Sequence, residues 1–231
     1  MVNATLHYIY DPFCGWCYAA SPLMRAAAGL EGLRLELHAG GMMSGPARQM
    51  VSPALRDYVM PHDHRIAAMT GLSFGEAYFE GLLRDNTAVF DSTPPIEAVL
   101  AFGKLGGQPQ TMLARLQQAH YQQGRRIADE AVLLELAQEL GQSAEAFSQA
   151  LQSVKAEAEA HIAATRQLMS QTGVRGFPAL LMERDGQWQR IDLSSWLGQP
   201  EAFAAALRDS LPQADAADGA FCTPEGCQPG G

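Results

Sequence analysis

Two cysteines at the junction between a strand-forming run and a helix-forming run constrain the fold of this chain most. Cys14 and Cys17 are separated by Gly-Trp. Residues 6–10 (Leu-His-Tyr-Ile-Tyr) are strand formers, and residues 33–38 alternate apolar and polar side chains as a half-covered strand does. Residues 14–29 between them are rich in Ala, Leu and Met and end in Gly, which predicts a helix. The pair therefore lies in an opening β-α-β unit.

Cysteines at this position can carry out thiol–disulfide exchange. A helix N-terminus has unpaired N–H groups and about half a positive charge, which stabilise a thiolate at the first cysteine. Cys14 is the predicted nucleophile, with its sulfur facing solvent, and Cys17 would displace the partner that Cys14 captures. A Cys-x-x-Cys pair alone could equally be half of a zinc site, but its place in a β-α-β unit favours redox chemistry.

Composition excludes several other classes of protein. The 231 residues are 47% apolar and carry 16 basic and 25 acidic residues, a net charge of −9, which argues against nucleic acid as a partner. No apolar run reaches the roughly 18 residues of a membrane span, and no leader precedes the first strand, so we expect a cytoplasmic protein without membrane contact. Four cysteines are too few for a disulfide-stapled scaffold.

The middle of the chain reads as helical almost throughout, with no convincing strand. Thr93, which precedes two prolines, is the predicted N-cap of one helix, and Asp129 opens another. Ser143 is a candidate cap for a further helix, and residues 154–171 form a separate long Ala-rich helix. This block interrupts the α/β part of the chain.

Strand patterns return after the helical block. Residues 179–183 and 187–191 are strand candidates around Asp185-Gly186, a hairpin-type turn signal, and a helix is predicted from Pro200 to Leu211. The predicted order is β-α-β, helical block, β-β-α. The corresponding domains are a first α/β part, a helical insertion domain, a second α/β part and a flexible tail, at residues 1–45, 46–172, 173–211 and 212–231.

The stretch Asp-Pro-Phe-Cys-Gly-Trp-Cys-Tyr, residues 11–18, resembles the active-site motif of the thioredoxin superfamily. It is similar in particular to the DsbA-like branch that includes FrnE and the predicted bacterial protein-disulfide isomerases. The resemblance covers residues 1 to about 211. It implies a thioredoxin-like fold with a large all-helical insertion domain, and a redox-active pair at Cys14 and Cys17.

Residues 172–178, Thr-Gly-Val-Arg-Gly-Phe-Pro, resemble the Gly-Val-x-Gly-x-Pro loop of the same family. The resemblance implies a cis bond before Pro178, a proline that faces the cysteines, and a free backbone at the preceding residue that can pair with an extended peptide. The alternative is an ordinary proline at the start of a strand. Phe13, Trp16 and Phe177 are the expected apolar rim of the site.

Three residues depart from the family pattern. Tyr8 stands where thioredoxin and DsbA carry a buried carboxylate, and Glu36 or Asp11 are the candidates to replace it. Trp16 stands where DsbA and disulfide isomerase carry a histidine that stabilises the thiolate, and Phe177 replaces the usual Val or Thr. The loss of the histidine predicts a couple that is less oxidising than DsbA, whose potential is about −120 mV.

A second pair, Cys222 and Cys227, encloses Thr-Pro-Glu-Gly, a type I turn pattern that would bring the two cysteines together. Two interpretations stay open: a second redox pair that exchanges electrons with the first, or an incidental dithiol in a loose end. A zinc site built from all four cysteines is a third. The segment His62-Asp63-His64 is interpreted as solvated or capping, because residues two apart do not share a helix face. The sequence thus predicts no metal site and no cofactor.

The resulting prediction is a thiol–disulfide oxidoreductase or protein-disulfide isomerase. Its partners would be protein or peptide thiols and disulfides, with glutathione or a thioredoxin-like protein as reductant. One alternative is a glutathione-dependent isomerase or transferase of the kappa class, which generally uses a serine in place of the first cysteine. Another is a redox-sensing or zinc-binding interaction protein.

Overall fold

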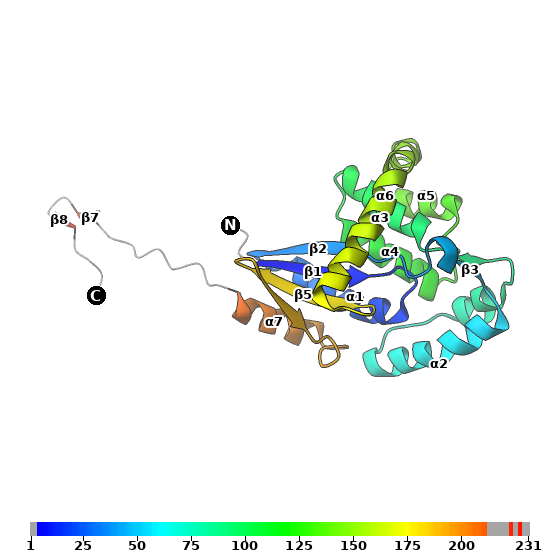
Figure 1. Ribbon diagram of the computed structural model, residues 1–231, viewed down its shortest axis with the longest axis horizontal. Helices are drawn as coiled ribbons and strands as arrows, with labels where there is room; N and C mark the ends of the chain where they lie inside the picture. The colour runs from blue at the N-terminus through cyan, green and yellow to red at the C-terminus, as the bar shows by residue number, and fades with distance from the viewer. Residues whose placement is uncertain (1–3, 212–221, 224–225, 228–231) are drawn as a thin grey trace.

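A four-stranded sheet forms the centre of the α/β part (Figure 1). The structure, a computed structural model, describes residues 4–211, 222–223 and 226–227. The sheet order is β2-β1-β5-β6; β1 and β2 are parallel, and β5 and β6 add antiparallel neighbours. The strands are β1 (Ala4–Tyr10), β2 (Leu33–Ala39), β5 (Ala179–Arg184) and β6 (Gln187–Ile191).

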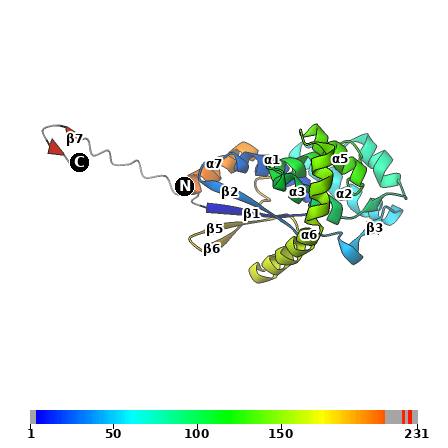
Figure 2. The same ribbon diagram turned by 90° about the horizontal axis from the view of Figure 1, so that it is seen from above.

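Helices cover the two faces of this sheet unequally. Helices α1 (Gly15–Ala28) and α7 (Pro200–Ser210) contact each other on one face, while α6 (Ala144–Thr172) crosses the other (Figure 2). Successive β1 side chains point to opposite faces. The Tyr8 hydroxyl donates to the Cys17 carbonyl on the α1 side, whereas Ile9 packs with apolar residues beside the end of α6.

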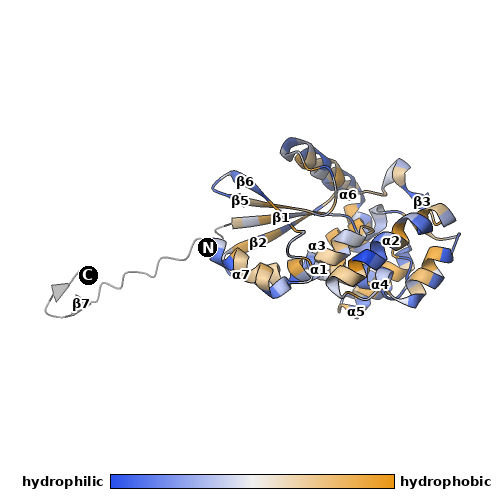
Figure 3. Ribbon diagram, turned by 90° about the horizontal axis from the view of Figure 1, so that it is seen from below, coloured by the Kyte–Doolittle hydropathy of each residue, from blue (hydrophilic) through white to orange (hydrophobic). Residues whose placement is uncertain are grey.

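The block between β2 and β5 is helical, as predicted, and its apolar residues are continuous with the core beneath the sheet. Each helix alternates apolar and hydrophilic stretches (Figure 3). Besides α6, the block contains α2 (Pro53–Thr70), α3 (Thr93–Lys104), α4 (Pro109–Tyr121), α5 (Glu130–Glu139) and helical turns at Gly45–Ala47, Ala77–Gly81 and Leu82–Arg84. The prediction of no strand here is wrong: β3 (Gln49–Met50) pairs with β4 (Val89–Phe90). Strands of two residues are too short to show a period in the sequence.

Two predicted helices are one continuous helix. The Ser143 hydroxyl accepts the Ala146 N–H at 3.1 Å, and α6 then runs for 29 residues to Gly173, which ends it in the left-handed conformation at φ 70°. No glycine or proline interrupts the sequence between these caps, so nothing breaks the backbone ladder. The predicted break before residue 154 is therefore wrong.

The start of α3 also differs from the prediction. Ser92, rather than Thr93, is the N-cap residue, and its side chain does not cap the helix. The Ser92 hydroxyl instead donates to the Asp11 carboxylate at 2.9 Å and accepts the Met43 N–H at 3.1 Å. Because Ser92 is fully buried, α3 is tied directly to the segment that precedes the cysteines.

The turn between β5 and β6 follows the sequence signal. Asp185 and Gly186 have φ of 48° and 73°, the two positive values that a two-residue hairpin turn of type I′ requires. At the other end of the described chain, β7 (Cys222–Thr223) and β8 (Gly226–Cys227) pair antiparallel, with Cys222 opposite Cys227. The turn predicted at residues 224–225 and the flexible tail predicted from residue 212 fall largely outside the described residues. Among the helices that are described, none combines the length and apolarity of a membrane span.

Candidate active site

The first cysteine pair lies at the N-terminus of α1, as predicted. Cys14 is the N-cap residue, and its Sγ accepts the backbone N–H of Cys17 at 3.3 Å. Both cysteines are free thiols. A sulfur that accepts a helix N-terminal N–H also lies at the positive end of the helix dipole. The local geometry therefore favours negative charge on Cys14.

The Cys14 thiol opens on a pocket rather than on open surface, which corrects the prediction of a solvent-facing sulfur. Cys14 is 7% exposed and Cys17 is fully buried. Cys14 lines a pocket of about 290 Å³ that also borders Leu55 and Val59 of α2, Tyr78 and Phe177. The helical block therefore covers the sulfur and leaves one side accessible.

Cys17 lies beneath Cys14 in the core. Burial raises the pKa of the Cys17 thiol, and the neighbouring Cys14 raises it further. The hydroxyl of Tyr8 donates to the Cys17 carbonyl at 3.0 Å, which holds the first turn of α1 on the sheet. Cys17 is thus a neutral thiol that must lose a proton before it can attack a disulfide.

Asp11 is the buried carboxylate beside the pair. It accepts hydrogen bonds from the Phe13 N–H at 2.9 Å, the Ser92 hydroxyl at 2.9 Å and the Met42 N–H at 2.6 Å. Burial raises the pKa of Asp11 to about 6, although these donors lower it. Asp11 and Glu36 are the two candidates to replace the family carboxylate. Asp11 lies beside the cysteines, where it accepts the Phe13 N–H, whereas Glu36 contacts His7.

Asp63 is a second buried carboxylate and lines the pocket on which Cys14 opens. The interpretation of residues 62–64 as solvated is therefore wrong for Asp63. Asp63 is 3% exposed and accepts the Tyr78 hydroxyl at 2.9 Å. A Cβ at Gly15 would lie 2.5 Å from Asp63 Oδ1, so the carboxylate is directly beside the residue that follows Cys14. Burial raises the pKa of Asp63 to about 7.

The sequence contains a signal for Asp63 that a motif-based reading misses. Leu55, Val59, Asp63 and Ile66 are spaced by four, four and three residues, which places them on one helix face. In the structure this face of α2 turns inward, and Leu55, Asp63 and Ile66 are buried. A single carboxylate on an otherwise apolar face is the pattern that marks a buried acid.

The three expected rim aromatics occupy different positions. Phe13 is buried and forms the floor of the pocket, stacked on Phe90 with ring centroids 4.8 Å apart, which corrects its placement on the rim. Trp16 and Phe177 are partly buried and border the pocket at Cys14. Both also border a second pocket. They are therefore the wall that the two pockets share.

The second pocket has a volume of about 510 Å³ and lies beside Pro178. The Phe177–Pro178 peptide bond is cis. Two cationic side chains, Arg65 and Arg190, and one carboxylate, Asp192, line this pocket, and the Arg65 guanidinium lies 5.8 Å from the Trp16 ring centroid. The structure thus places a partly aromatic pocket with two guanidinium groups next to the cysteine pocket.

A β-α-β unit with a Cys-x-x-Cys pair at the start of its helix, followed after a helical block by a cis-proline and a β-hairpin, defines a thiol–disulfide oxidoreductase of the thioredoxin fold. The chain belongs to the DSBA-like thioredoxin domain family, whose model matches residues 5–207. Both the fold class and the enzyme class predicted from the sequence are confirmed.

Solved structures of disulfide reductases and a related protein are similar to this chain. The cytosolic disulfide reductase DsbM from Pseudomonas aeruginosa is 53% identical, with a TM-score of 0.84 over 89% of this chain and 98% of that one. A structure of DsbM with glutathione gives 50% identity and a TM-score of 0.83 over the same shares. A proposed protein disulfide isomerase from Nitrosomonas europaea is 27% identical, with a TM-score of 0.72 over 90% and 97% of the two chains. The comparison with curated proteins gives no significant match.

Proposed function

We propose that this oxidoreductase works as a cytoplasmic disulfide reductase that takes its electrons from glutathione, with Cys14 as nucleophile and Cys17 as resolving thiol. The observation that carries the proposal is the position of Cys14. Its sulfur accepts a helix N-terminal N–H and opens on a pocket, while Cys17 is fully buried. The similarity to a cytosolic disulfide reductase, which has also been solved with glutathione, supports this direction of electron flow.

The proposed reaction begins at Cys14. Its thiolate attacks one sulfur of a substrate disulfide, the substrate S–S bond breaks, and one substrate thiolate leaves. Cys17 loses its proton and attacks Cys14 Sγ, which releases the second substrate thiolate and leaves a Cys14–Cys17 disulfide. One glutathione thiolate then attacks Cys14 and restores Cys17. A second attacks the resulting mixed disulfide, so that oxidised glutathione leaves with the two electrons balanced.

We assign Asp63 as the group that accepts the proton of Cys17 during this exchange and later returns it. A carboxyl group with a pKa of about 7 is partly ionised at neutral pH, so it can both accept a proton and return it. Its position against Gly15 places it at the first turn of α1, within the pocket that Cys14 lines. Asp11 is less suited to proton transfer because three donors already hold its two oxygens.

The second pocket supplies a site for the reductant. Glutathione carries two carboxylates, and Arg65 and Arg190 are the cations that line this pocket. The wall of Trp16 and Phe177 would lie between these cations and Cys14, and it offers an apolar surface to the middle of the tripeptide. Arg65→Gln and Arg190→Gln are expected to raise the KM for glutathione several-fold while kcat changes little.

The direct test is a trapping experiment with glutathione disulfide. In Cys17→Ser the resolving thiol is absent, so a mixed disulfide of Cys14 with glutathione should accumulate. Peptide mapping by mass spectrometry locates it on Cys14 and separates it from any adduct at Cys222 or Cys227. Cys14→Ser is the matched control and should form no adduct at residue 17, because Cys17 is buried. Equal adduct formation at Cys14 in one variant and at Cys17 in the other would contradict the assignment of nucleophile and resolving thiol.

We also propose that Cys222 and Cys227 form a second redox pair. The antiparallel register, with Cys222 opposite Cys227, supports it. Full-length chain and a form ending at Leu211 should then differ in the equilibrium of disulfide exchange with glutathione, and Cys222→Ser with Cys227→Ser should reproduce the truncated form. Identical titrations of the full-length and truncated forms at Cys14 and Cys17 would refute this second proposal and leave the first untouched.

A further inference from the structure

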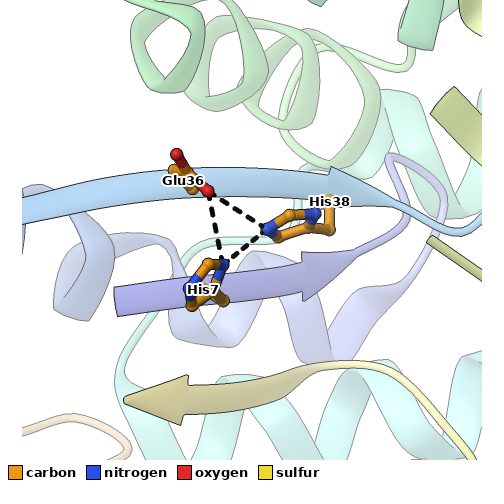
Figure 4. A group of neighbouring side chains, drawn as sticks. All are labelled: His7, Glu36 and His38. Atoms are coloured by element: carbon orange, nitrogen blue, oxygen red, sulfur yellow. Dashed lines mark hydrogen bonds and ion pairs between the residues drawn. The ribbon is translucent and has the colours of Figure 1, made fainter. Parts of the chain in front are cut away.

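A cluster of two histidines and one glutamate, His7, His38 and Glu36, lies on the sheet (Figure 4), and a second glutamate, Glu183, contacts His7. His7 of β1 is paired in register with Glu36 of β2, and Ile9 is paired with His38. Since side chains alternate along a strand, His7, Glu36 and His38 share one face. Tyr8, the neighbour of His7, points the other way and bonds to the Cys17 carbonyl. The cluster is therefore separate from the active site.

Three atoms of the cluster converge on one point. His7 Nδ1 lies 2.9 Å from His38 Nε2 and 3.4 Å from Glu36 Oε2, and His38 Nε2 lies 3.8 Å from that same oxygen. A tetrahedral ion with bonds of 2.0–2.1 Å holds its ligand atoms about 3.4 Å apart. The three edges of this triangle average close to that value. Within the described part of the chain, this is the one such group of three metal-ligating side chains.

Glu183 sets the tautomer of His7. Its carboxylate lies 3.0 Å from His7 Nε2 and can only accept, so this nitrogen carries the proton. In a neutral ring His7 Nδ1 then carries a lone pair, which lies within hydrogen-bond distance of His38 Nε2 at 2.9 Å and 3.4 Å from Glu36 Oε2. A bound ion would replace the proton that the two histidine nitrogens otherwise share. A carboxylate on the outer nitrogen of a histidine is the arrangement that orients histidine ligands in metal sites.

The surroundings hold the ligands and leave one side open. The Trp188 ring packs against His7 with centroids 4.5 Å apart and ring planes tilted by 30°. The His38 ring lies nearly parallel to His161, whose Nε2 accepts the Ala39 N–H at 2.9 Å. The Glu36 side chain is one-third exposed. An ion held by three protein atoms would keep a fourth position on this solvent side.

From this geometry we propose that His7 Nδ1, His38 Nε2 and a carboxylate oxygen of Glu36 form a binding site for a divalent transition-metal ion, of which zinc is the first to test. Two imidazoles and one carboxylate suit zinc and iron(II), whereas magnesium and calcium prefer all-oxygen sites. Glu183 is the positioning residue that holds His7 in the ligand tautomer. The site joins neighbouring strands, so a bound ion would stabilise the sheet by mass action.

The competing interpretation is a proton in place of the ion. If His7 were an imidazolium, its two N–H groups would be balanced by Glu183 and by Glu36 or His38, and no metal would be needed. The two interpretations differ in a nitrogen-15 NMR spectrum of the histidine rings. An imidazolium that persists at pH 8 and does not change on addition of zinc would overturn the proposal.

The binding experiment uses the full-length chain with both cysteine pairs oxidised, so that no thiolate competes for zinc; thiol titration in denaturant checks this. Calorimetric titration of the chelator-treated protein with zinc sulfate should give one site per chain. Glu36→Gln with His38→Gln should weaken binding at least a hundredfold, and Glu183→Gln about tenfold. Glu31→Gln with His62→Gln is the matched control on exposed residues and should bind as wild type.

Folding of the variants is checked by circular dichroism, and Glu36→Gln alone serves if the double variant does not fold. Zinc should also raise the Tm of wild type and of the control but not that of the ligand variants. Binding that is equal in the ligand variants and wild type, or no binding at millimolar zinc, would refute the site. Neither result bears on the proposed disulfide reductase, because activity does not enter the measurement.

Discussion

Two buried carboxylates flank the cysteine pair, and their hydrogen bonds differ. Asp11 is held by three donors and has a pKa of about 6, whereas Asp63 has a single donor, Tyr78, and a pKa of about 7. Hydrogen bonds to an ionised carboxylate favour the charge, and burial opposes it. Asp11 is therefore suited to organising the backbone around Cys14, and Asp63 to exchanging a proton.

Asp63→Asn tests whether the buried charge of Asp63 lowers the free energy of unfolding. The folded pKa of about 7 lies above the ordinary value of 3.8, so the folded chain binds the proton more tightly and wild type loses stability as pH rises from about 4 to above 7. Asparagine cannot ionise and can still accept the Tyr78 hydroxyl. The variant should match wild type near pH 4 and unfold with about 2–4 kcal/mol more free energy at pH 8, measured by urea denaturation. A variant less stable than wild type at pH 8 would contradict this.

Asp63→Asn should also change the pH profile of disulfide reduction. A wild-type rate that depends on the ionised carboxylate should fall as pH drops below about 7. The variant should be slower at pH 7.5 by at least tenfold and should lack this inflection. Glu76→Gln, at an exposed carboxylate, is the control and should keep the wild-type profile. A variant that keeps the inflection would exclude Asp63 as its source.

At the residue scale, the sequence predicted the groups that lie in motifs and missed those assembled by packing. Cys14, Cys17 and Pro178 stand in local patterns with a known spacing. Asp63 reaches Gly15 only because α2 packs over the start of α1. The same packing lowers the exposed fraction of Cys14. The sulfur was expected to face solvent, but it lines a pocket instead.

The hydrogen bond from Ser92 to Asp11 connects the start of α3 with the segment before α1, which lies 81 residues away in the sequence. Ser92→Ala tests this connection. The change leaves the Met43 N–H and part of Asp11 without a buried partner. The expected loss is about 1–3 kcal/mol of unfolding free energy, with a lower rate of disulfide reduction because Asp11 holds the segment before Cys14. Ser143→Ala removes the α6 cap and should cost about 1 kcal/mol without slowing the reaction. A Ser92→Ala protein as active and as stable as wild type would exclude the connection.

At the element scale, local signals predicted where elements exist better than where they begin. The Asp185-Gly186 turn was predictable because its backbone angles demand such residues. The start of α3 was not, because Ser92 uses its hydroxyl for a distant carboxylate instead of the helix N-terminus. The cluster of His7, Glu36, His38 and Glu183 was not predictable for a related reason, since its residues become neighbours only through the register of β1, β2 and β5.

The whole molecule combines a thioredoxin-type sheet with a helical block that roofs the Cys14 pocket. We propose that this block, residues 46–172, is an insertion domain that shares the core of the α/β part and selects the disulfides which reach the sulfur. Because Trp16 replaces the histidine that stabilises the thiolate in DsbA, the equilibrium potential should lie well below about −120 mV, near the glutathione poise of about −220 to −260 mV. Titration against glutathione measures it, and a value close to that of DsbA would contradict a reductase.

The central claim is that Cys14, and not Cys17, is the sulfur that reacts. Brief treatment of the reduced native protein with iodoacetamide, followed by peptide mapping, tests it most directly. We predict that Cys14 is alkylated while Cys17 stays protected, and that disulfide reduction is lost in proportion to the modified fraction of Cys14. Alkylation of both cysteines at equal rates, or full activity after Cys14 is modified, would contradict the account.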